Sequence, residues 1–451
     1  MQSPDLDQPV LEVHQVHKVI TMLAIQKNES YIDLIDRRVM PFVEYEGYSD
    51  RYTAQSALTF EENFYKEIRA ASRELFLIFE KTVKIFQKSS EKFLEQMDFP
   101  KKLIPFLNIP NVLNLSTWLS RFDFVIDQNE QLKLIEINAD TPCGIIEAYY
   151  VNEIAAKSLS YENPNFNEQM KLKSFLHDIR QKISPPRISI SSGIFNRRKP
   201  FIFSCFDDYV EDYATTIYLM KLMKSESMSD DVEFVSFYDL RVDEEGLLLP
   251  DGRYAGAIYR LHPIEILIEE TATDDTELGV YFMEKYAEKK FAMFNPPEAV
   301  IMQNKSFLAL VWQVFINGGY FDSFERQVIE KYMLPSYFEE DELNDETYIK
   351  KPIWGREGRN ISIVNGKNKI IYENKIDSPN EIICRESKKC MYQKFVDSKH
   401  FEVLTDSGLK NGMITIGCFM IGDRSSAVYC RFSEERILGN EAYYVPLLIE
   451  N

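Results

Sequence analysis

The stretch that decides the fold is residues 121–144, which read RFDFVIDQNEQLKLIEINADTPCG. Polar and apolar residues alternate along two runs on either side of the polar turn 127–130, and this alternation predicts a β-hairpin. Successive side chains of a strand point to opposite faces, so we expect Arg121 and Asp123 to share one face, as do Glu136 and Asn138 in the second strand. The opposite faces take the apolar residues, which are Phe122, Phe124 and Ile126 in the first strand and Ile135 and Ile137 in the second.

The polar face of this hairpin favours a site for a divalent cation. It places an arginine, two carboxylates and a carboxamide on one patch, which is backed by apolar residues. Oxygen ligands without histidine or cysteine suit Mg²⁺, which commonly completes its coordination with water and nucleotide phosphates. A polar hairpin face that is simply exposed to solvent is the alternative interpretation.

The residues that follow the hairpin predict an anion-binding helix start. The segment 140–144 leads into a helical pattern at 145–156. The first backbone N–H groups of a helix have no partner within the helix, so they readily bind a phosphate or a carboxylate. Because this helix start follows directly on the second strand, we expect it to lie beside the polar hairpin face.

Two further stretches carry residues suited to phosphate binding. Lys305 precedes an apolar helix that begins near Ser306, where its side chain can present a mobile cation to a nucleotide. Lys351 ends a predicted strand, and Gly355 and Gly358 follow it before the next strand begins. Glycines in such a loop let backbone amides approach phosphates closely. The alternatives are an exposed lysine in the first case and a tight basic hairpin turn in the second.

The composition limits the functional classes. The chain has 451 residues, of which 45% are hydrophobic, enough for roughly three domains or lobes at about 150 residues each. Its formal net charge is −19, from 52 basic and 71 acidic residues, and such a surface repels nucleic acid and anionic membranes. No apolar run approaches the roughly 20 residues of a membrane span, and the first residues do not resemble a signal peptide. We therefore expect a cytoplasmic protein.

The cysteines agree with that compartment. They form no CxxC pair and have few histidines to assist them, so neither a zinc site nor a disulfide framework is indicated. A papain-like nucleophile in the first hundred residues is excluded, because the first cysteine is Cys143. The full set is Cys143, Cys205, Cys384, Cys390, Cys418 and Cys430.

Periodicity along the chain predicts a mixed α/β protein in four parts. Residues 1–118 form a helical N-terminal part whose main feature is a long amphipathic helix, or two in succession, at 60–93. The hairpin and its following helix occupy 119–200, which ends in a linker-like stretch at 183–200. Strands and helices alternate over 201–298, which predicts a small α/β lobe. Residues 299–451 mix strands and turns after the helix near Ser306 and carry the phosphate-binding stretches.

Together these residues resemble the synthetase part of the glutathionylspermidine synthase family, a branch of the ATP-grasp ligases. The most specific match is Arg121, Asp123 and the run 136–142. The other matching segments are Glu211-Asp212, 259–265, Asn304-Lys305, 351–353, 355–358, Tyr392-Gln393 and Arg431. The resemblance implies a permuted ATP-grasp fold, in which the metal hairpin precedes the nucleotide lysines, with an α/β substrate lobe of the pre-ATP-grasp type.

The resemblance also implies an activity and its cofactors. The reaction is ATP-dependent formation of an amide bond between a glutathione-like peptide and a polyamine-like amine, through an acyl phosphate. ATP and Mg²⁺ are the implied cofactors, and the partners are small molecules rather than nucleic acid or membrane. Some family members carry an additional amidase domain, which we do not expect here. The remaining alternatives are a catalytically inactive ATP-binding regulator or scaffold, and a kinase that releases a stable acyl phosphate.

Site residues follow from the same resemblance. The implied metal ligands are Asp123, Glu136 and Asn138. The implied nucleotide-binding residues are Lys305, Lys351, Gly355, Gly358 and Gln393. Arg121 and Arg431 are the implied catalytic residues, and Arg121, Thr141 and Cys143 are expected to hold the acceptor carboxylate.

An acidic group in the α/β lobe is the candidate amine site. Asp208, Glu211 and Asp212 stand at i, i+3 and i+4, which predicts that they lie on one side of a helix near 209–223. They can receive the ammonium groups of a polyamine. A solvated acidic face on a strongly acidic protein is the alternative.

Overall fold

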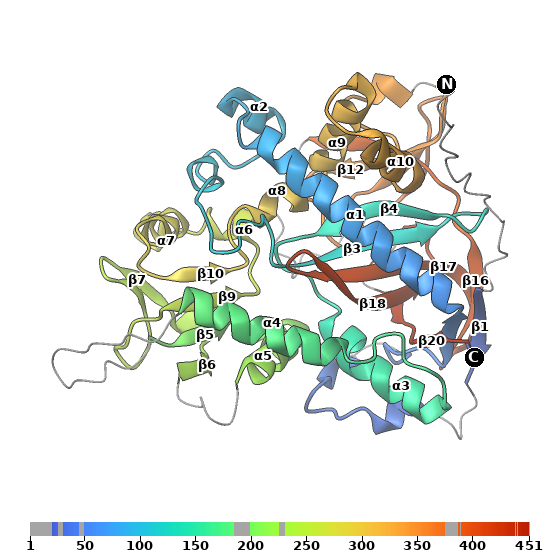
Figure 1. Cartoon of the computed structure of the whole chain (residues 1–451), viewed down its shortest axis with the longest axis horizontal. Helices are drawn as coiled ribbons and strands as arrows, with labels where there is room; N and C mark the ends of the chain where they lie inside the picture. Colours follow the sequence, from blue (N-terminus) through green and yellow to red (C-terminus); the bar gives the residue numbers. More distant parts are fainter. Residues whose placement is uncertain are drawn as a thin grey trace, which may run out of the picture.

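The structure, a computed structural model, describes residues 20–25, 30–44, 49–184, 199–224, 231–343, 345–374, 387, 389–437, 439 and 441–450. It has helices packed around several β-sheets, and the predicted mixed α/β class is confirmed (Figure 1). Most of the predicted linker 183–200, and Cys384, lie outside these residues. No helix among the described residues is long and apolar enough to cross a membrane.

A six-stranded antiparallel sheet forms the centre of the molecule. The predicted hairpin supplies β3 (Leu119–Ile126) and β4 (Leu132–Asn138), and β3 pairs with the long strand β17 (Gly408–Ile421). The strands β18 (Arg424–Ser433) and β19 (Tyr443–Tyr444) continue the sheet beyond β17, and β16 (His400–Thr405) pairs with another part of β17. Residues from the middle and the end of the chain therefore share one sheet.

The hairpin register places the polar residues opposite one another. Arg121 pairs with Asn138 and Asp123 pairs with Glu136. The register then shifts, so that Phe124 pairs with Leu134 and Ile135 is left over as a β-bulge. The predicted core face of β3 is confirmed, but the prediction for β4 is wrong at one residue: Leu134 joins Ile137 in the core, and Ile135 does not. The bulge resets the alternation that the sequence pattern assumes.

Helices cover both faces of this sheet. The predicted amphipathic segment forms two helices, α1 (Glu62–Phe86) and the short α2 (Glu91–Gln96), with the Ser90 side chain accepting a hydrogen bond at the start of α2. Phe79 of α1 stacks on Phe122 of β3 at a centroid distance of 5.7 Å. The opposite face packs against α4 (Glu168–Ile183) and the helix that follows the hairpin. That helix starts at residue 145, passes through a π-helical turn (Glu147–Val151) and ends as α3 (Asn152–Leu159).

A parallel sheet in the order β10-β9-β5-β6 forms the α/β lobe. Its strands are β5 (Phe201–Ser204), β6 (Val232–Phe234), β9 (Ala257–Arg260) and β10 (Ala292–Phe294). The helices of this region are α5 (Val210–Met223), α6 (Ile264–Leu267) and α7 (Leu278–Ala287), beside a small hairpin of β7 (Arg241–Asp243) and β8 (Gly246–Leu248). Figure 1 shows this lobe beside the central sheet, next to α4.

The lysine-bearing segments belong to a third region. Three helices, α8 (Ala299–Gln303), α9 (Ser306–Asn317) and α10 (Ser323–Tyr332), precede a five-stranded antiparallel sheet. The strands of that sheet are β11 (Ser336–Tyr337), β12 (Tyr348–Pro352), β13 (Ser362–Val364), β14 (Ile370–Glu373) and β15 (Cys390–Lys394). A small sheet of β1 (Ile20–Ala24), β2 (Ser56–Phe60) and β20 (Leu447–Ile449) joins segments from near both ends of the chain.

Candidate active site

The first component of the site is a buried ion pair on the hairpin. Arg121 donates from Nε to Asp123 Oδ1 at 2.7 Å and from Nη2 to Asp123 Oδ2 at 2.8 Å, which is a bidentate fork. Asn138 on the neighbouring strand donates from Nδ2 to the same Asp123 Oδ2 at 3.0 Å. The predicted polar face therefore exists, and it is buried rather than solvent-exposed at Arg121 and Asp123.

A glycine on the adjacent strand makes room for this ion pair. Gly417 of β17 pairs with Asp123 across the sheet. A Cβ atom at Gly417 would lie 2.8 Å from Arg121 Cδ and 2.9 Å from Asp123 Oδ1, which is closer than real Cβ contacts come. Any other residue at this position would have to displace the Arg121–Asp123 fork.

Two lysines from the third region meet the hairpin beside this ion pair. Lys305 Nζ donates to Glu136 Oε2 at 2.8 Å. Lys351 Nζ, at the end of β12, donates to Gln393 Oε1 at 2.8 Å and to the backbone oxygen of Ile135 at 2.9 Å. The bulge leaves that carbonyl outside the ladder, so the irregularity in β4 gives Lys351 a partner.

The pKa values of Lys351 and Glu136 are both shifted in this site. Burial lowers the pKa of Lys351 to about 7, although the negative charge of Glu136 opposes the shift. Burial raises the pKa of Glu136, but the ion pair with Lys305 and the charge of Lys351 outweigh it and hold that pKa well below its ordinary value. Glu136 is therefore a carboxylate at neutral pH, while Lys351 changes its charge in the physiological range.

The glycine loop connects three parts of the molecule. After β12, the backbone N–H of Gly355 donates to Pro352 O at 3.0 Å, and Gly358 has a φ of +67°, a conformation that glycine adopts without strain. Between them, Arg356 donates from Nη2 to Glu265 Oε1 at 2.6 Å and reaches Thr141 Oγ1 at 3.5 Å. The loop is therefore tied to both the α/β lobe and the helix start.

The helix start is held against the lobe by a buried ion pair. Arg260 of β9 donates to both carboxylate oxygens of Asp140, at 2.6 and 2.9 Å, and both side chains are fully buried. On the other side, Arg121 donates to the backbone oxygen of Cys143. Gly144 has a φ of +86°, and a Cβ there would lie 2.9 Å from the ring of Tyr429. The helix start lies beside the polar hairpin face, as the sequence predicts.

One tyrosine ring contacts both predicted catalytic arginines. The guanidinium carbons of Arg121 and Arg431 lie 5.2 and 5.7 Å from the ring centroid of Tyr429, within the range of cation–π attraction. The ring of Tyr444 stacks on Tyr429 at 6.1 Å with an interplanar angle of 12°. Arg431 and Tyr429 stand two residues apart on β18, which runs on to Ser433, so their side chains share one face of the sheet.

A buried network supports that ring from behind. The hydroxyl oxygens of Tyr429 and Tyr52 lie 3.1 Å apart, and Tyr52 donates to Glu147 Oε1 at 3.0 Å. Burial raises the pKa of Glu147. Its second oxygen and the Nε of Arg431 are buried without a hydrogen-bond partner among the described residues. Glu147 lies in the π-helical turn, a feature that recurs at functional sites.

The predicted acidic group is divided by the structure. Glu211 and Asp212 lie in the first turn of α5, where burial raises the pKa of each to about 7, and the charge of Arg356 partly opposes this for Asp212. Asp208 does not lie on the helix, which begins at Val210, so that part of the prediction is wrong. Asp208 instead accepts a hydrogen bond of 3.1 Å from the hydroxyl of Tyr238. Because the helix begins after Asp208, the i, i+3 and i+4 spacing holds in the sequence but does not place this residue on the helix face.

The chemistry of the hairpin donors fits a hard cation. Asp123 and Glu136 are paired across the hairpin, and the amide oxygen of Asn138 is free of the bond that its nitrogen makes to Asp123. Among the described residues, no group of three or more His, Cys, Asp or Glu side chains is arranged to hold a metal. A metal here would therefore combine two carboxylates with an amide oxygen and with oxygens from water or substrate, as Mg²⁺ does.

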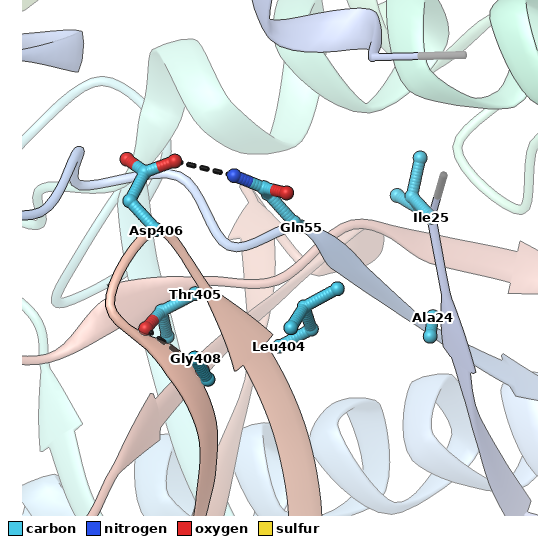
Figure 2. Close-up of a pocket in the computed structure, with 7 residues that line it drawn as sticks. All are labelled: Ala24, Ile25, Gln55, Leu404, Thr405, Asp406 and Gly408. Carbon is cyan, nitrogen blue, oxygen red and sulfur yellow. Dashed lines mark hydrogen bonds between the residues drawn. The ribbon is translucent and has the colours of Figure 1, made fainter. Parts of the chain in front are cut away.

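Neither cavity described for this structure coincides with these residues. A cavity of about 330 Å³ lies between β1, Gln55 and the β16–β17 turn, where Asp406 accepts a hydrogen bond from Gln55 (Figure 2). The second, of about 380 Å³, lies between α1 and α4. The predicted site is instead marked by its ion pairs and its shifted pKa values.

Several residues of the site have no recognisable signal in the sequence. Tyr52, Glu147 and Tyr429 are ordinary polar or aromatic residues far apart in the chain, and Gly417 lies within a strand pattern. Gly417 alone had a usable signal, because a glycine inside a strand indicates a close approach by another group. The tyrosines and the glutamate become functional candidates only through their contacts.

The fold and the site define a class of protein. It is a mixed α/β protein in which buried lysines and arginines meet paired carboxylates at the junction of three regions, an arrangement suited to anionic substrates. The chain belongs to the family described as glutathionylspermidine synthase preATP-grasp, whose family model matches residues 23–450. The recognition made from the sequence motifs is confirmed.

Individual relatives are similar at low identity. A putative acid–amine ligase from Haemophilus influenzae is 24% identical over 337 residues, which cover 72% of this chain and 73% of that protein. The bifunctional glutathionylspermidine synthetase/amidase of Escherichia coli is 22% identical over 413 residues, or 87% of this chain, which spans 59% of the length of that enzyme. The solved structure of a putative gamma-glutamylcysteine synthetase from Methylobacillus flagellatus is 10% identical, and the match covers 81% of this chain and 84% of that one. Its TM-score of 0.42 is too low to establish a shared fold.

Proposed function

We propose that this chain is an ATP-dependent acid–amine ligase that joins a peptide-like carboxylic acid to a polyamine-like amine through an acyl phosphate. The observation that carries the proposal is the meeting of Lys305 and Lys351 with Glu136 on the polar hairpin face. Buried lysines beside a carboxylate provide the charges that a nucleotide triphosphate and its metal ion require. Membership of the family and similarity to an acid–amine ligase support the same assignment.

The charge balance of the site favours an anionic ligand. Arg121, Lys305 and Lys351 supply up to three positive charges, and Asp123 and Glu136 supply two negative ones, which leaves a net charge of +1 when Lys351 is protonated. Nucleotide phosphates would take over the lysine contacts now made by Glu136, Gln393 and the bulge carbonyl.

The hairpin oxygens are the proposed metal ligands. Asp123, Glu136 and Asn138 would hold Mg²⁺, which when bound neutralises phosphate charge and orients the nucleotide. The Arg121 fork fixes the orientation of the Asp123 carboxylate. Gln393 holds Lys351 by its side-chain oxygen and is itself fixed by a 3.1 Å hydrogen bond to Ser336.

The reaction then divides into two displacements. An oxygen of the acceptor carboxylate attacks the γ-phosphorus of ATP, the bond to the β-γ bridging oxygen breaks, and ADP leaves. The amine, as its free base, then attacks the acyl carbon and inorganic phosphate leaves, which produces the amide. Arg121 and Arg431, held by Tyr429, are placed to stabilise the negative charge on the transferring group and on the tetrahedral intermediate.

Two neighbouring surfaces are the proposed substrate contacts. Thr141 and Cys143 stand at the helix start, where the backbone N–H groups can receive the acceptor carboxylate. Glu211 and Asp212, opposite Arg356, are the proposed partners of the amine's ammonium groups. A bound polyamine cation would return their raised pKa values toward the ordinary range. Gly355 and Gly358 would let the loop backbone approach the phosphates.

Release of ADP measures this function directly. We expect ADP release that requires both a glutathione-like peptide and a polyamine, and that Glu136→Gln lowers it by at least ~10²-fold. Glu153→Gln on the exposed surface of α3 is the matched control and should keep parent activity. Amine-independent ADP release would indicate a kinase. Tight ATP binding without turnover of any peptide–amine pair would indicate a regulator or scaffold, and either result would contradict the proposal.

A further inference from the structure

The cavity between α1 and α4 has four basic residues among the nine that line it. It has a volume of about 380 Å³ and is bordered by Arg69 and Arg73 of α1, Lys171 of α4 and Arg424 at the start of β18. Figure 1 shows the β17–β18 turn between these two helices. Asp178 is the acidic residue of the lining. The lining itself carries four cations and one carboxylate, and two further carboxylates outside it, Glu168 and Glu74, pair with three of these cations. The chain as a whole has a net charge of −19, so a remaining positive excess at one cavity stands out.

Arg69 is held in this cavity wall by four side-chain hydrogen bonds. Its Nη2 donates to Ser425 O at 2.6 Å, and its Nε lies 3.4 Å from the Ser425 hydroxyl. Its Nη1 donates to Glu168 Oε1 at 2.8 Å and to the Tyr65 hydroxyl at 3.0 Å. A guanidinium has five N–H donors, so these four bonds leave one donor on Nη2. A fixed, partly used arginine is a preorganised contact for an acceptor.

The other cations keep most of their donors. Lys171 makes one ion pair, of 2.7 Å, to the same Glu168, and Arg73 makes one, of 3.0 Å, to Glu74. Arg424 is exposed and has no ion pair or side-chain hydrogen bond to any described residue. The cavity is therefore rich in N–H donors and poor in acceptors, which favours a ligand with several anionic oxygens.

Two serines, Ser174 and Ser425, and two apolar residues complete the lining. The apolar pair, Phe175 of α4 and Ile421 of β17, is buried. The turn fits closely here, since a Cβ at Gly422 would lie 3.3 Å from the Phe175 ring. The volume falls at the lower end of the range for small-molecule sites, roughly 300–1,000 Å³. An apolar floor under a basic rim suits a small organic anion rather than a macromolecule.

We infer that this cavity is a binding site for a small organic anion that carries phosphate or multiple carboxylate groups. It shares no residue with the candidate active site, and the inference does not depend on the proposed ligase activity. The anionic groups contact Arg69, Arg73, Lys171 and Arg424, and the body of the molecule rests on Phe175 and Ile421. Phosphate and carboxylate ligands share this chemistry, and the choice of probes distinguishes them.

Isothermal titration calorimetry with the full chain tests the inference. The probes are AMP, which has a phosphate and a planar base, citrate, which has three carboxylates, and adenosine, which is uncharged. The test variants are Arg424→Glu and Arg73→Glu, two exposed positions at which we expect normal folding. Arg241→Glu is the matched control, because Arg241 is an exposed arginine of β7 without an ion pair to a described residue.

We expect millimolar or tighter binding of AMP, citrate or both, and no binding of adenosine. Arg424→Glu and Arg73→Glu should each weaken that binding at least tenfold, while Arg241→Glu changes it less than twofold. Binding of AMP alone assigns the site to phosphate ligands, and binding of citrate alone assigns it to carboxylates. The inference is overturned if neither anion binds, if adenosine binds as well as AMP, or if anion binding is unchanged in both cavity variants, because the anion would then occupy another site.

Discussion

Removing the shared ring at Tyr429 should impair catalysis without preventing folding. Tyr429 contacts the guanidinium groups of Arg121 and Arg431 at 5.2 and 5.7 Å. A cation–π contact stabilises by about 0.5–1 kcal/mol when exposed and by about 2 kcal/mol when desolvated. Arg121 is buried and Arg431 is half-buried, so together the two contacts amount to about 3 kcal/mol. If that energy positions the arginines for the transition state, its loss lowers kcat by roughly 10²-fold.

The ring and the hydroxyl can be separated by two variants. Tyr429→Leu removes the ring and should show the full loss of kcat, with KM for ATP changed by less than about threefold. Tyr429→Phe keeps the ring and should retain kcat within about tenfold. Phe432→Leu is the control, because Phe432 lies on the same strand but faces the core on the other side of the sheet. It should lower the melting temperature without lowering kcat.

Steady-state kinetics of ADP release, with a melting curve for each variant, provides the measurement. A folded Tyr429→Leu variant with the parent kcat would refute the reasoning, since the arginines would then be positioned by other contacts. Equal losses in Tyr429→Leu and Phe432→Leu would identify the effect as a general loss of stability.

Three further outcomes are expected. Gly417→Ala should lower the free energy of unfolding by about 1–3 kcal/mol in urea denaturation, because the added Cβ would lie under 3.0 Å from Arg121 and Asp123. An unchanged free energy of unfolding would mean that the ion pair relaxes freely. ATP binding at pH 8 should take up a proton, because the pKa of Lys351 is about 7 in the free protein and phosphate binding raises it. Calorimetry in two buffers of different ionisation enthalpy measures this proton uptake, and Lys351→Met should abolish it. KM for a polyamine should fall as pH rises from 6 to 8, because Asp212, with a pKa of about 7, becomes charged over this range; Asp212→Asn should flatten that profile, and an unchanged profile would remove Asp212 from the amine site.

Local patterns in the sequence predicted a large part of the fold. The hairpin and its polar face follow from the alternation of side chains, because a strand's period is fixed by its own backbone. The helix start after 144 follows from the change to helical periodicity. The family motifs predicted that Lys305 and Lys351 serve the same nucleotide site as the hairpin. Periodicity could not show this, because more than 150 residues separate Lys305 from Glu136.

Errors in the prediction arose where contacts rather than periodicity decide the structure. Alternation placed Ile135 in the core, but the bulge at this residue shifts the register. The freed carbonyl of Ile135 instead accepts a hydrogen bond from Lys351, which comes from β12. The spacing of the acidic group placed Asp208 on a helix that begins two residues later. A helix boundary depends on what caps and covers it, which a spacing rule does not include.

The sequence by itself determined the family, the mixed α/β class and the chemical types gathered on the hairpin. These depend on the order and identity of neighbouring residues. Only the tertiary structure decided how those groups are charged and held. Lys351 has a pKa of about 7 because it is buried. Tyr429 makes cation–π contacts with two arginines because β3 and β18 both pair with β17. The physical reason is that burial and cation–π contacts depend on distances between residues far apart in the chain, which side-chain periodicity does not encode.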